Sequence, residues 1–178
     1  NKQIYHIYNI FWLLDQNWFL ATVSGGMGYK HANLAIEANG MGVFDLGLRG
    51  CRPDISPDGR KVAWNRGDWT LSVADLELTP TPRTSGHREV AASSKPNMVY
   101  QVDWSPDGKY LAFLSDRAGG EDQAFTLFRR GGDAVRRSAV EQGVTSFEWS
   151  PDSTRLVLVI KDPKPGDPSS EEQEESEK

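Results

Sequence analysis

The sequence lacks several features that would place it in a well-defined class of protein. Cysteine occurs once, at Cys51, so no disulfide can form within the chain and the redox compartment stays open. No apolar run approaches the ~20 residues that a membrane-spanning helix requires. The net charge is −5 over 178 residues, without a basic stripe. We therefore expect no membrane insertion and no nucleic-acid partner.

Motifs for catalysis and metal binding are missing as well. The pentad Gly-x-Ser-x-Gly, which presents a serine nucleophile on a strand-to-helix turn, does not occur. His6, His31 and His87 lie far apart and show no paired-ligand spacing. The glycine-rich stretch "SGGMG" (24–28) precedes a strand-like segment instead of the helix that a phosphate cradle uses, so it predicts a hairpin loop. We predict no catalytic residue, no cofactor and no metal site in this chain.

Most of the negative charge lies at the C-terminal end. Residues 163–178, "PKPGDPSSEEQEESEK", contain six acidic and two basic residues, which gives −4 of the total of −5. The segment contains no hydrophobic residue that could be buried. Its composition predicts a disordered tail or linker.

What the sequence does contain is a repeated turn between two short apolar runs. Three copies carry Ser-Pro-Asp: "DISPDGRKVAWN" (54–65), "QVDWSPDGKYLAFLSDR" (101–117) and "EWSPDSTRLVLVI" (148–160); "FWLLDQNWFLATV" (11–23) is a degenerate fourth. The anchoring aspartates Asp15, Asp58, Asp107 and Asp152 are 43, 49 and 45 residues apart. Pro, Asp and Gly favour β-turns, so we interpret the serines of these turns as structural and not as nucleophiles.

Strand-like segments fill the remainder of each repeat. Third strands are predicted at 31–40, 68–78 and 122–130, and weaker fourth strands at 43–46, 88–92 and 134–139. A turn with flanking strands, repeated at a period in the forties, is typical of propeller blades. We predict an all-β chain, a β-propeller of four-stranded antiparallel blades. Its three full blades span about 1–47, 48–93 and 94–140, and a partial fourth spans 141–162.

One acidic position recurs in the repeats. Asp54, Asp103 and Glu148 each lie four residues before a turn aspartate, whereas Phe11 occupies this place in the first copy. The first strand of a propeller blade is innermost, so equivalent positions line the central channel. The three carboxylates are candidates for binding a cation or the basic end of a peptide. The alternative is that each caps its turn or pairs with Arg or Lys of a neighbouring blade.

The repeats resemble a known family. "CRPDISPDGRKVAW", "VDWSPDGKYLAFLSDR" and "FEWSPDSTRLVLVI" resemble the WD40-like repeats of TolB-like β-propellers. Residues 20–104 are similar to stand-alone bacterial TolB-like propellers. Residues 99–178 are similar to the propeller that precedes the hydrolase domain in acylaminoacyl-peptidase-like members of the prolyl oligopeptidase family. The resemblance implies a larger ring of six or seven blades and a bacterial setting, in the periplasm or the cytoplasm.

The number of blades and the function stay open at this point. Propellers close with about four to eight blades, so we expect a fragment of a longer chain, as the absence of an initial Met suggests. Otherwise a second copy supplies the missing blades, or the repeats close a very small ring. Two functions fit. The first is a non-catalytic module that binds a protein or peptide. The second is the substrate-gating propeller of a serine peptidase, separated from the hydrolase domain that carries the catalytic triad in that family.

Overall fold

The chain folds into β-sheets throughout. The computed structural model describes residues 4–13, 17–25, 29–66, 70–92 and 99–163. All regular elements in these ranges are β-strands. No helix in this part of the chain is long and apolar enough to cross a membrane.

Fourteen strands form four antiparallel sheets within the described residues. The first sheet contains β1 (Ile4–Trp12), β2 (Trp18–Gly25), β3 (Tyr29–Glu37) and β4 (Val43–Arg49). The second contains β5 (Cys51–Ile55), β6 (Lys61–Asn65), β7 (Thr70–Glu77) and β8 (Arg83–Ala92). The third contains β9 (Val99–Trp104), β10 (Tyr110–Ser115), β11 (Gln123–Phe128) and β12 (Val135–Arg136). The fourth contains only β13 (Val144–Trp149) and β14 (Leu156–Ile160).

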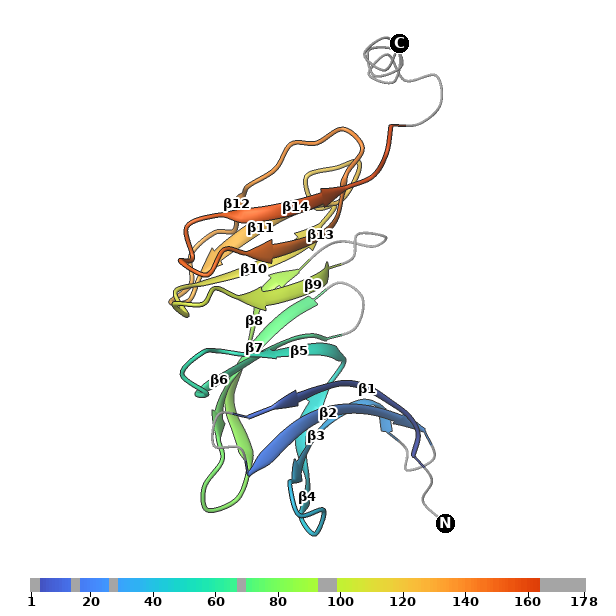
Figure 1. Ribbon diagram of the computed structural model, residues 1–178, viewed down its shortest axis with the longest axis vertical. Helices are drawn as coiled ribbons and strands as arrows, with labels where there is room; N and C mark the ends of the chain where they lie inside the picture. The colour runs from blue at the N-terminus through green and yellow to red at the C-terminus, as the bar shows by residue number, and fades with distance from the viewer. Residues whose placement is uncertain (1–3, 14–16, 26–28, 67–69, 93–98, 164–178) are drawn as a thin grey trace.

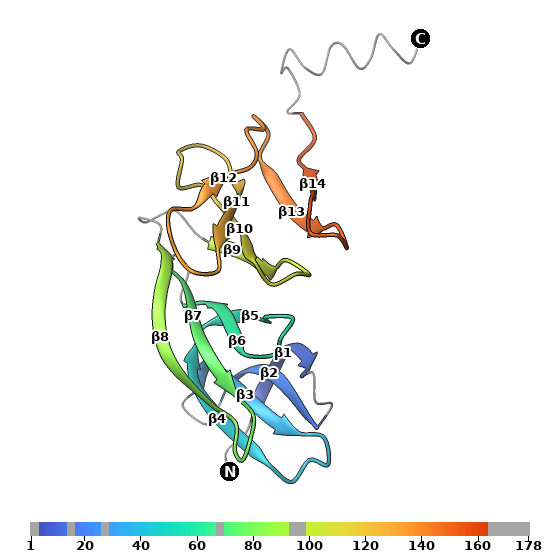
Figure 2. The same ribbon diagram turned by 90° about the vertical axis from the view of Figure 1, so that its left-hand side faces the viewer.

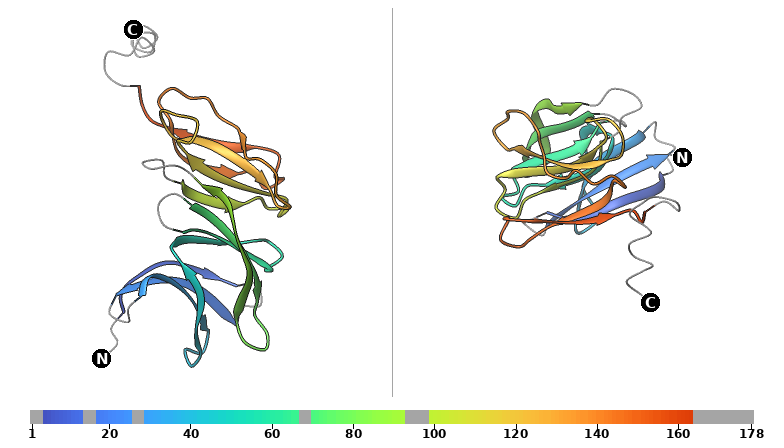
Figure 3. Two further views of the ribbon diagram at one scale, coloured as in Figure 1. Left: turned by 180° about the vertical axis from the view of Figure 1, so that it is seen from behind. Right: turned by 90° about the horizontal axis from the view of Figure 1, so that it is seen from above.

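The sheets follow one another in chain order along the long axis of the molecule (Figure 1). Neighbouring strands of each sheet are consecutive in the sequence, so every sheet is a simple meander. Figure 2 shows β13 and β14 standing beside the third sheet, and Figure 3 shows the same succession from behind and from above. The predicted all-β fold of four-stranded antiparallel sheets is confirmed.

The fourth strands differ in extent from their predicted ranges. Strand β8 begins at Arg83, because residues 83–85 pair with β7 although they carry no apolar alternation. Strand β12 contains only two residues, which pair with Phe125 and Thr126 of β11. Outer strands have few neighbours to pack against, so their apolar pattern is weak. The pattern therefore predicts too short a strand for β8 and too long a strand for β12.

The Ser-Pro-Asp turns share one set of hydrogen bonds. The Ser105 hydroxyl donates to Oδ1 of Asp107 at 2.7 Å and accepts the backbone N–H of Tyr110 at 2.9 Å. Gly108 adopts a φ of +67°, which glycine tolerates without steric cost. The same hydroxyl contacts recur at Ser56 and Ser150. These serines are therefore engaged in turn geometry, as their sequence context predicts.

Apolar side chains fill the space between successive sheets. Between the second and third sheets, Leu71 and Val73 pack with Leu111, Phe113 and Phe125 in one buried cluster. The rings of Phe113 and Phe125 stack at 5.7 Å between centroids. Comparable clusters join the first sheet to the second and the third to the fourth. This packing fixes how each sheet sits against its neighbour.

Polar contacts also cross from sheet to sheet. Arg129, which follows β11, forms an ion pair of 2.8 Å with Asp58 in the β5–β6 turn. The Arg129 guanidinium also lies over the Trp104 ring, 5.7 Å from its centroid. Partial burial opposes ionisation of Asp58, but hydrogen bonds from Ser56 and Arg129 outweigh it and lower the Asp58 pKa to about 2. The turn of the second sheet is thereby tied to the third.

The two end sheets expose apolar side chains. Ile10 and Trp12 of β1 are 61% and 65% exposed, and Val157 and Val159 of β14 are 66% and 54% exposed. No further sheet of the described residues covers these faces. Exposed large apolar side chains on an uncovered sheet face are typical of an interaction surface where they form a patch.

Candidate binding site: the inner-strand cavity

A cavity of about 400 Å³ lies where the first strands of all four sheets come together. It is lined by Phe11 of β1, residues 52–54 of β5, residues 101–103 of β9 and residues 145–146 of β13. In Figure 1 these strands follow one another along one side of the stack. Two members of the acidic series, Asp54 and Asp103, line the cavity.

Asp54 joins the second sheet to the third. Its Oδ2 accepts the backbone N–H of Trp104 at 2.6 Å, and its Oδ1 accepts the N–H of Ile55 at 2.9 Å. Burial raises the Asp54 pKa to about 6, and the nearby charge of Asp103 adds to the increase, whereas the two backbone hydrogen bonds oppose it. Asp54 therefore changes its charge close to neutral pH.

Asp103 occupies the equivalent position of the next sheet. Gln101 donates from Nε2 to Asp103 Oδ2 at 2.6 Å and to the carbonyl of Phe147 at 2.7 Å. The Gln101 side-chain oxygen accepts the N–H of Phe147 at 3.2 Å. Burial raises the Asp103 pKa, the Gln101 hydrogen bond lowers it, and the charge of Glu148 raises it again. Gln101 thus connects β9 to β13 and holds the Asp103 carboxylate in place.

Glu148 completes the series but faces solvent. Asp54, Asp103 and Glu148 pair across their hairpins with Ala63, Ala112 and Val157 respectively, so all three occupy the same register position. Glu148 is exposed and does not line the cavity, although its charge acts on Asp103. The repeat position therefore places two carboxylates at the cavity and the third beside it.

Two lining residues were not singled out in the sequence. Arg52 adopts a φ of +53° at a register irregularity between Cys51 and Asp54, and it is exposed where it lines the cavity. The repeat pattern does not predict this bulge, because the spacing from Asp54 to the turn aspartate is the same four residues as in the other repeats. Gln101 is signalled only as a polar residue two positions before Asp103.

The chemistry of the cavity is that of hydrogen bonding and charge. No group of three or more His, Cys, Asp or Glu residues that could hold a metal ion occurs in the described part of the chain. The carboxylate oxygens can accept from an ammonium group, and Arg52 can donate to a carbonyl or carboxylate. Part of the glycine-rich stretch, residues 26–28, lies outside the described residues, but the strands on either side of it, β2 and β3, pair as a hairpin.

Comparison with solved structures identifies the architecture. TolB from Acinetobacter baumannii superposes with a TM-score of 0.65 over 88% of this chain and 38% of TolB, at 18% identity. The fold is that of β-propeller blades, as in TolB. A puromycin hydrolase gives a TM-score of 0.62 over 86% of this chain and 30% of the hydrolase, at 19% identity.

Sequence comparison points to a peptidase among the curated relatives. The uncharacterized peptidase YuxL of Bacillus subtilis (strain 168) is 29% identical over 118 residues, which are 61% of this chain and 17% of YuxL. No family model matches the sequence. This chain therefore spans a small part of YuxL and between a quarter and two fifths of the TolB and puromycin hydrolase chains.

Proposed function

We propose that this chain is a non-catalytic β-propeller module that binds a protein or peptide in the inner-strand cavity. The observation that supports the proposal is the cavity itself, which is lined by the first strands of all four sheets. Two partly buried carboxylates line it, and backbone and amide groups hold them in position. A site assembled from repeated elements suits an extended ligand better than a small compact one. The serines of the Ser-Pro-Asp turns are bonded within their turns and offer no free nucleophile.

The preferred ligand is a peptide with a basic end. Asp54 and Asp103 supply negative charge above the Asp54 pKa of about 6, and an amino terminus or a lysine ammonium supplies complementary donors. Among the described residues, no group of three or more His, Cys, Asp or Glu side chains is placed to hold a metal ion. This favours an ammonium group over a metal ion as the positively charged ligand. Binding should therefore weaken as the pH falls below about 6, where Asp54 takes up a proton.

The test is a titration with a fluorescently labelled basic octapeptide that has a free amino terminus. The variant Asp54→Asn/Asp103→Asn/Glu148→Gln is compared with wild type at neutral pH. The exposed loop variant Asp133→Asn, which removes one carboxylate charge outside the cavity, serves as the control. We expect the triple variant to lose at least about tenfold in affinity, as for removal of charged hydrogen-bond partners, and the control to bind normally. Unchanged affinity in the triple variant would remove the cavity from consideration.

A second function is favoured by the relatives. YuxL is named a peptidase, and the solved structures of similar fold include a puromycin hydrolase and prolyl endopeptidases. We propose as the alternative that this chain forms part of the substrate-gating propeller of a prolyl oligopeptidase family serine peptidase. The coding sequence beyond Lys178 provides the test. A following α/β-hydrolase domain with Gly-x-Ser-x-Gly supports the gating function, whereas a stop codon or an unrelated domain contradicts it.

A further inference from the structure

A small cavity, about 240 Å³ in volume, lies between the first and second sheets. Strand β4 contacts β8, and Figure 2 shows the two strands side by side. Each of the two sheets has four strands, so the cavity is formed by two complete sheets. Its lining includes Arg49, Trp64, Arg66, Ser72 and residues 87–89, and we refer to it as the arginine cavity.

A buried hydroxyl without a partner lines the arginine cavity. Ser72 is 2% exposed, and its Oγ forms no hydrogen bond with any described residue. Trp64 is buried to the same degree, but its indole N–H donates to the carbonyl of Arg49 at 3.1 Å. Buried polar groups in folded proteins nearly always have a hydrogen-bond partner. The Ser72 hydroxyl is therefore available to an acceptor atom that enters the cavity.

Positive charge exceeds negative charge on the lining. Three arginines line the cavity, and Glu89 is the one carboxylate among the lining residues that the structure describes. Arg66 approaches Glu89 to 3.4 Å, but both side chains are more than half exposed, so this ion pair contributes little. Arg88 donates from Nη2 to the carbonyl of Arg129 at 3.1 Å and forms no ion pair with a described residue. The cavity is thus suited to an anion.

Contacts within and between the two sheets hold two further lining groups in place. The Arg49 guanidinium donates to both carboxylate oxygens of Asp45, at 2.9 and 2.7 Å. The Thr84 hydroxyl donates to the carbonyl of Leu46 at 2.7 Å, so it accepts the Nε2–H of His87 at 2.8 Å. A ligand therefore meets groups whose positions are already set, which reduces the entropy that binding costs.

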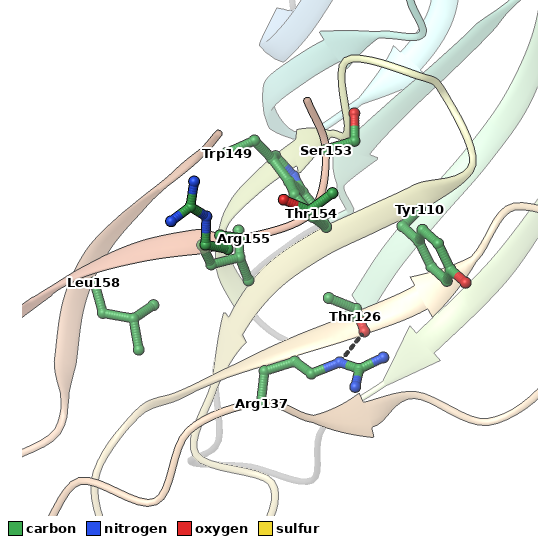
Figure 4. A pocket seen from close by; sticks show the side chains of 9 residues that line it. Tyr110, Thr126, Arg137, Trp149, Ser153, Thr154, Arg155 and Leu158 are labelled. Atoms are coloured by element: carbon green, nitrogen blue, oxygen red, sulfur yellow. Dashed lines mark hydrogen bonds between the residues drawn. The ribbon is translucent and has the colours of Figure 1, made fainter. Parts of the chain in front are cut away.

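A second cavity with arginines differs in both respects. It has a volume of about 370 Å³ and is lined by Arg137 and Arg155 (Figure 4). There the buried Thr126 hydroxyl already has a partner, because Nε of Arg137 donates to it at 2.8 Å. Leu156 and Leu158 also form part of the lining. Of the two, the arginine cavity combines more positive charge with an unpartnered buried hydroxyl.

A phosphate group matches the donors of the arginine cavity. Arginine donates to phosphate oxygens in two parallel N–H···O bonds, and a serine hydroxyl donates one more. Phosphate is tetrahedral and presents oxygens in several directions, whereas a planar carboxylate is satisfied by one guanidinium. The donors here come from β4, β7, β8 and the residue after β6. We propose that the arginine cavity binds a phosphate group, with the three arginines around its oxygens and the Ser72 hydroxyl donating to one of them.

The proposed site is separate from the inner-strand cavity. That cavity is lined by the first strands of the sheets, whereas later strands line the arginine cavity. The phosphate site therefore does not depend on the function proposed above. Pockets for small molecules have volumes of about 300–1,000 Å³, so this smaller cavity holds the phosphate group and little of the molecule that carries it.

The test is a calorimetric titration of the 178-residue chain with inorganic phosphate, at neutral pH and with chloride keeping the ionic strength constant. O-phosphoserine is the probe for a phosphate monoester, and acetate is the probe for a carboxylate. Arg88→Gln and Ser72→Ala are compared with wild type. The matched control is Arg155→Gln, which removes an exposed arginine from the other cavity.

We expect wild type to bind inorganic phosphate more tightly than acetate. Arg88→Gln should weaken phosphate binding at least about tenfold, as for loss of a hydrogen bond between charged groups. Ser72→Ala should weaken it about threefold to fivefold, because a neutral hydroxyl contributes less. Arg155→Gln should change it by no more than about twofold. Ser72→Ala should also leave the urea midpoint unchanged, since its hydroxyl has no partner to lose, so weaker binding by this variant does not reflect unfolding.

Four results would overturn the proposal. The first is absence of phosphate binding to wild type, and the second is equal binding by wild type, Arg88→Gln and Ser72→Ala. The third is an equal loss in Arg155→Gln, which would assign the effect to overall charge. The fourth is acetate binding as tight as that of phosphate. Tighter binding of O-phosphoserine than of inorganic phosphate supports the proposal with a monoester as the ligand, and the reverse order supports it with free phosphate.

Discussion

The titration of Asp54 gives the sharpest test of the inner-strand cavity. The carboxylate is partly removed from water and faces Asp103, which raises its pKa from 3.8 to about 6. One pKa unit corresponds to about 1.4 kcal/mol, so keeping Asp54 ionised in the folded chain costs about 3 kcal/mol relative to the unfolded chain. Because the folded pKa is the higher one, the folded state binds more protons between these values. Stability from this group therefore falls as pH rises from about 4 to about 6 and is level above that range.

The assay is urea unfolding of wild type and Asp54→Asn at several pH values between about 4 and 7.5, followed by circular dichroism. The amide cannot titrate, so the free energy of unfolding of wild type minus that of the variant should fall by about 2 to 3 kcal/mol across this range. Asp152→Asn is a control of opposite sign. Its hydrogen bonds from Ser150 and Thr154 lower the pKa of the exposed Asp152 carboxyl, so the wild-type advantage over that variant should shrink as pH falls. A pH-independent difference for Asp54→Asn would refute the burial argument.

Three further substitutions test the turns, the close approaches and the links between sheets. Ser105→Ala should destabilise the chain by about 2 kcal/mol, because Ser105 is fully buried and the substitution leaves its two hydrogen-bond partners without their bonds. Ser150 makes the same contacts near solvent, so Ser150→Ala should cost less than about 1 kcal/mol. Equal costs in urea unfolding would contradict this reasoning. Gly50→Ala should cost about 3 kcal/mol or more, since Gly50 has a φ of +131° and a Cβ there would lie 1.9 Å from a carbonyl oxygen of β6. Gly40 has open space around it, so Gly40→Ala should cost about 1 kcal/mol. Thermal unfolding measures the difference in stability between the two variants. Arg129→Ala should destabilise the chain by about 1 kcal/mol through loss of the half-buried ion pair with Asp58. If this cost were the same at low and high salt, the contact of Arg129 with the Trp104 ring would account for it instead.

The turns and the inner hairpins could be predicted because their residues are dictated locally. Pro, Asp and Gly specify the turn after Ser56 or Ser105 whatever lies around it, and the short apolar run after the turn is rich in strand-forming residues. Repetition at a period in the forties then identifies the architecture. Leu111 and Phe113 are buried as this pattern implies.

The contacts between sheets could not be read from the same pattern. For Asp54 the sequence predicts either binding of a cation or a basic peptide end, or a turn cap or a pair with Arg or Lys. The structure adds a contact that neither hypothesis names, from the backbone N–H of Trp104 in the next sheet. Gln101 connects to Phe147 across a separation of 46 residues, and no local rule specifies such a partner. The position of the acidic series along the inner strands was predictable. Its division into two lining carboxylates and the exposed Glu148 depends on how the sheets rotate against each other.

The way hydrogen bonds are distributed has a consequence for how this architecture can vary. Backbone ladders close within each sheet, and side chains such as those of Asp54, Gln101 and Arg129 cross to the neighbour. Each sheet therefore depends on the sheets beside it and on little else, as in proteins built from stacked repeats. Because each sheet is built from consecutive strands, insertion or removal of a whole repeat would leave the backbone ladder of every remaining sheet intact.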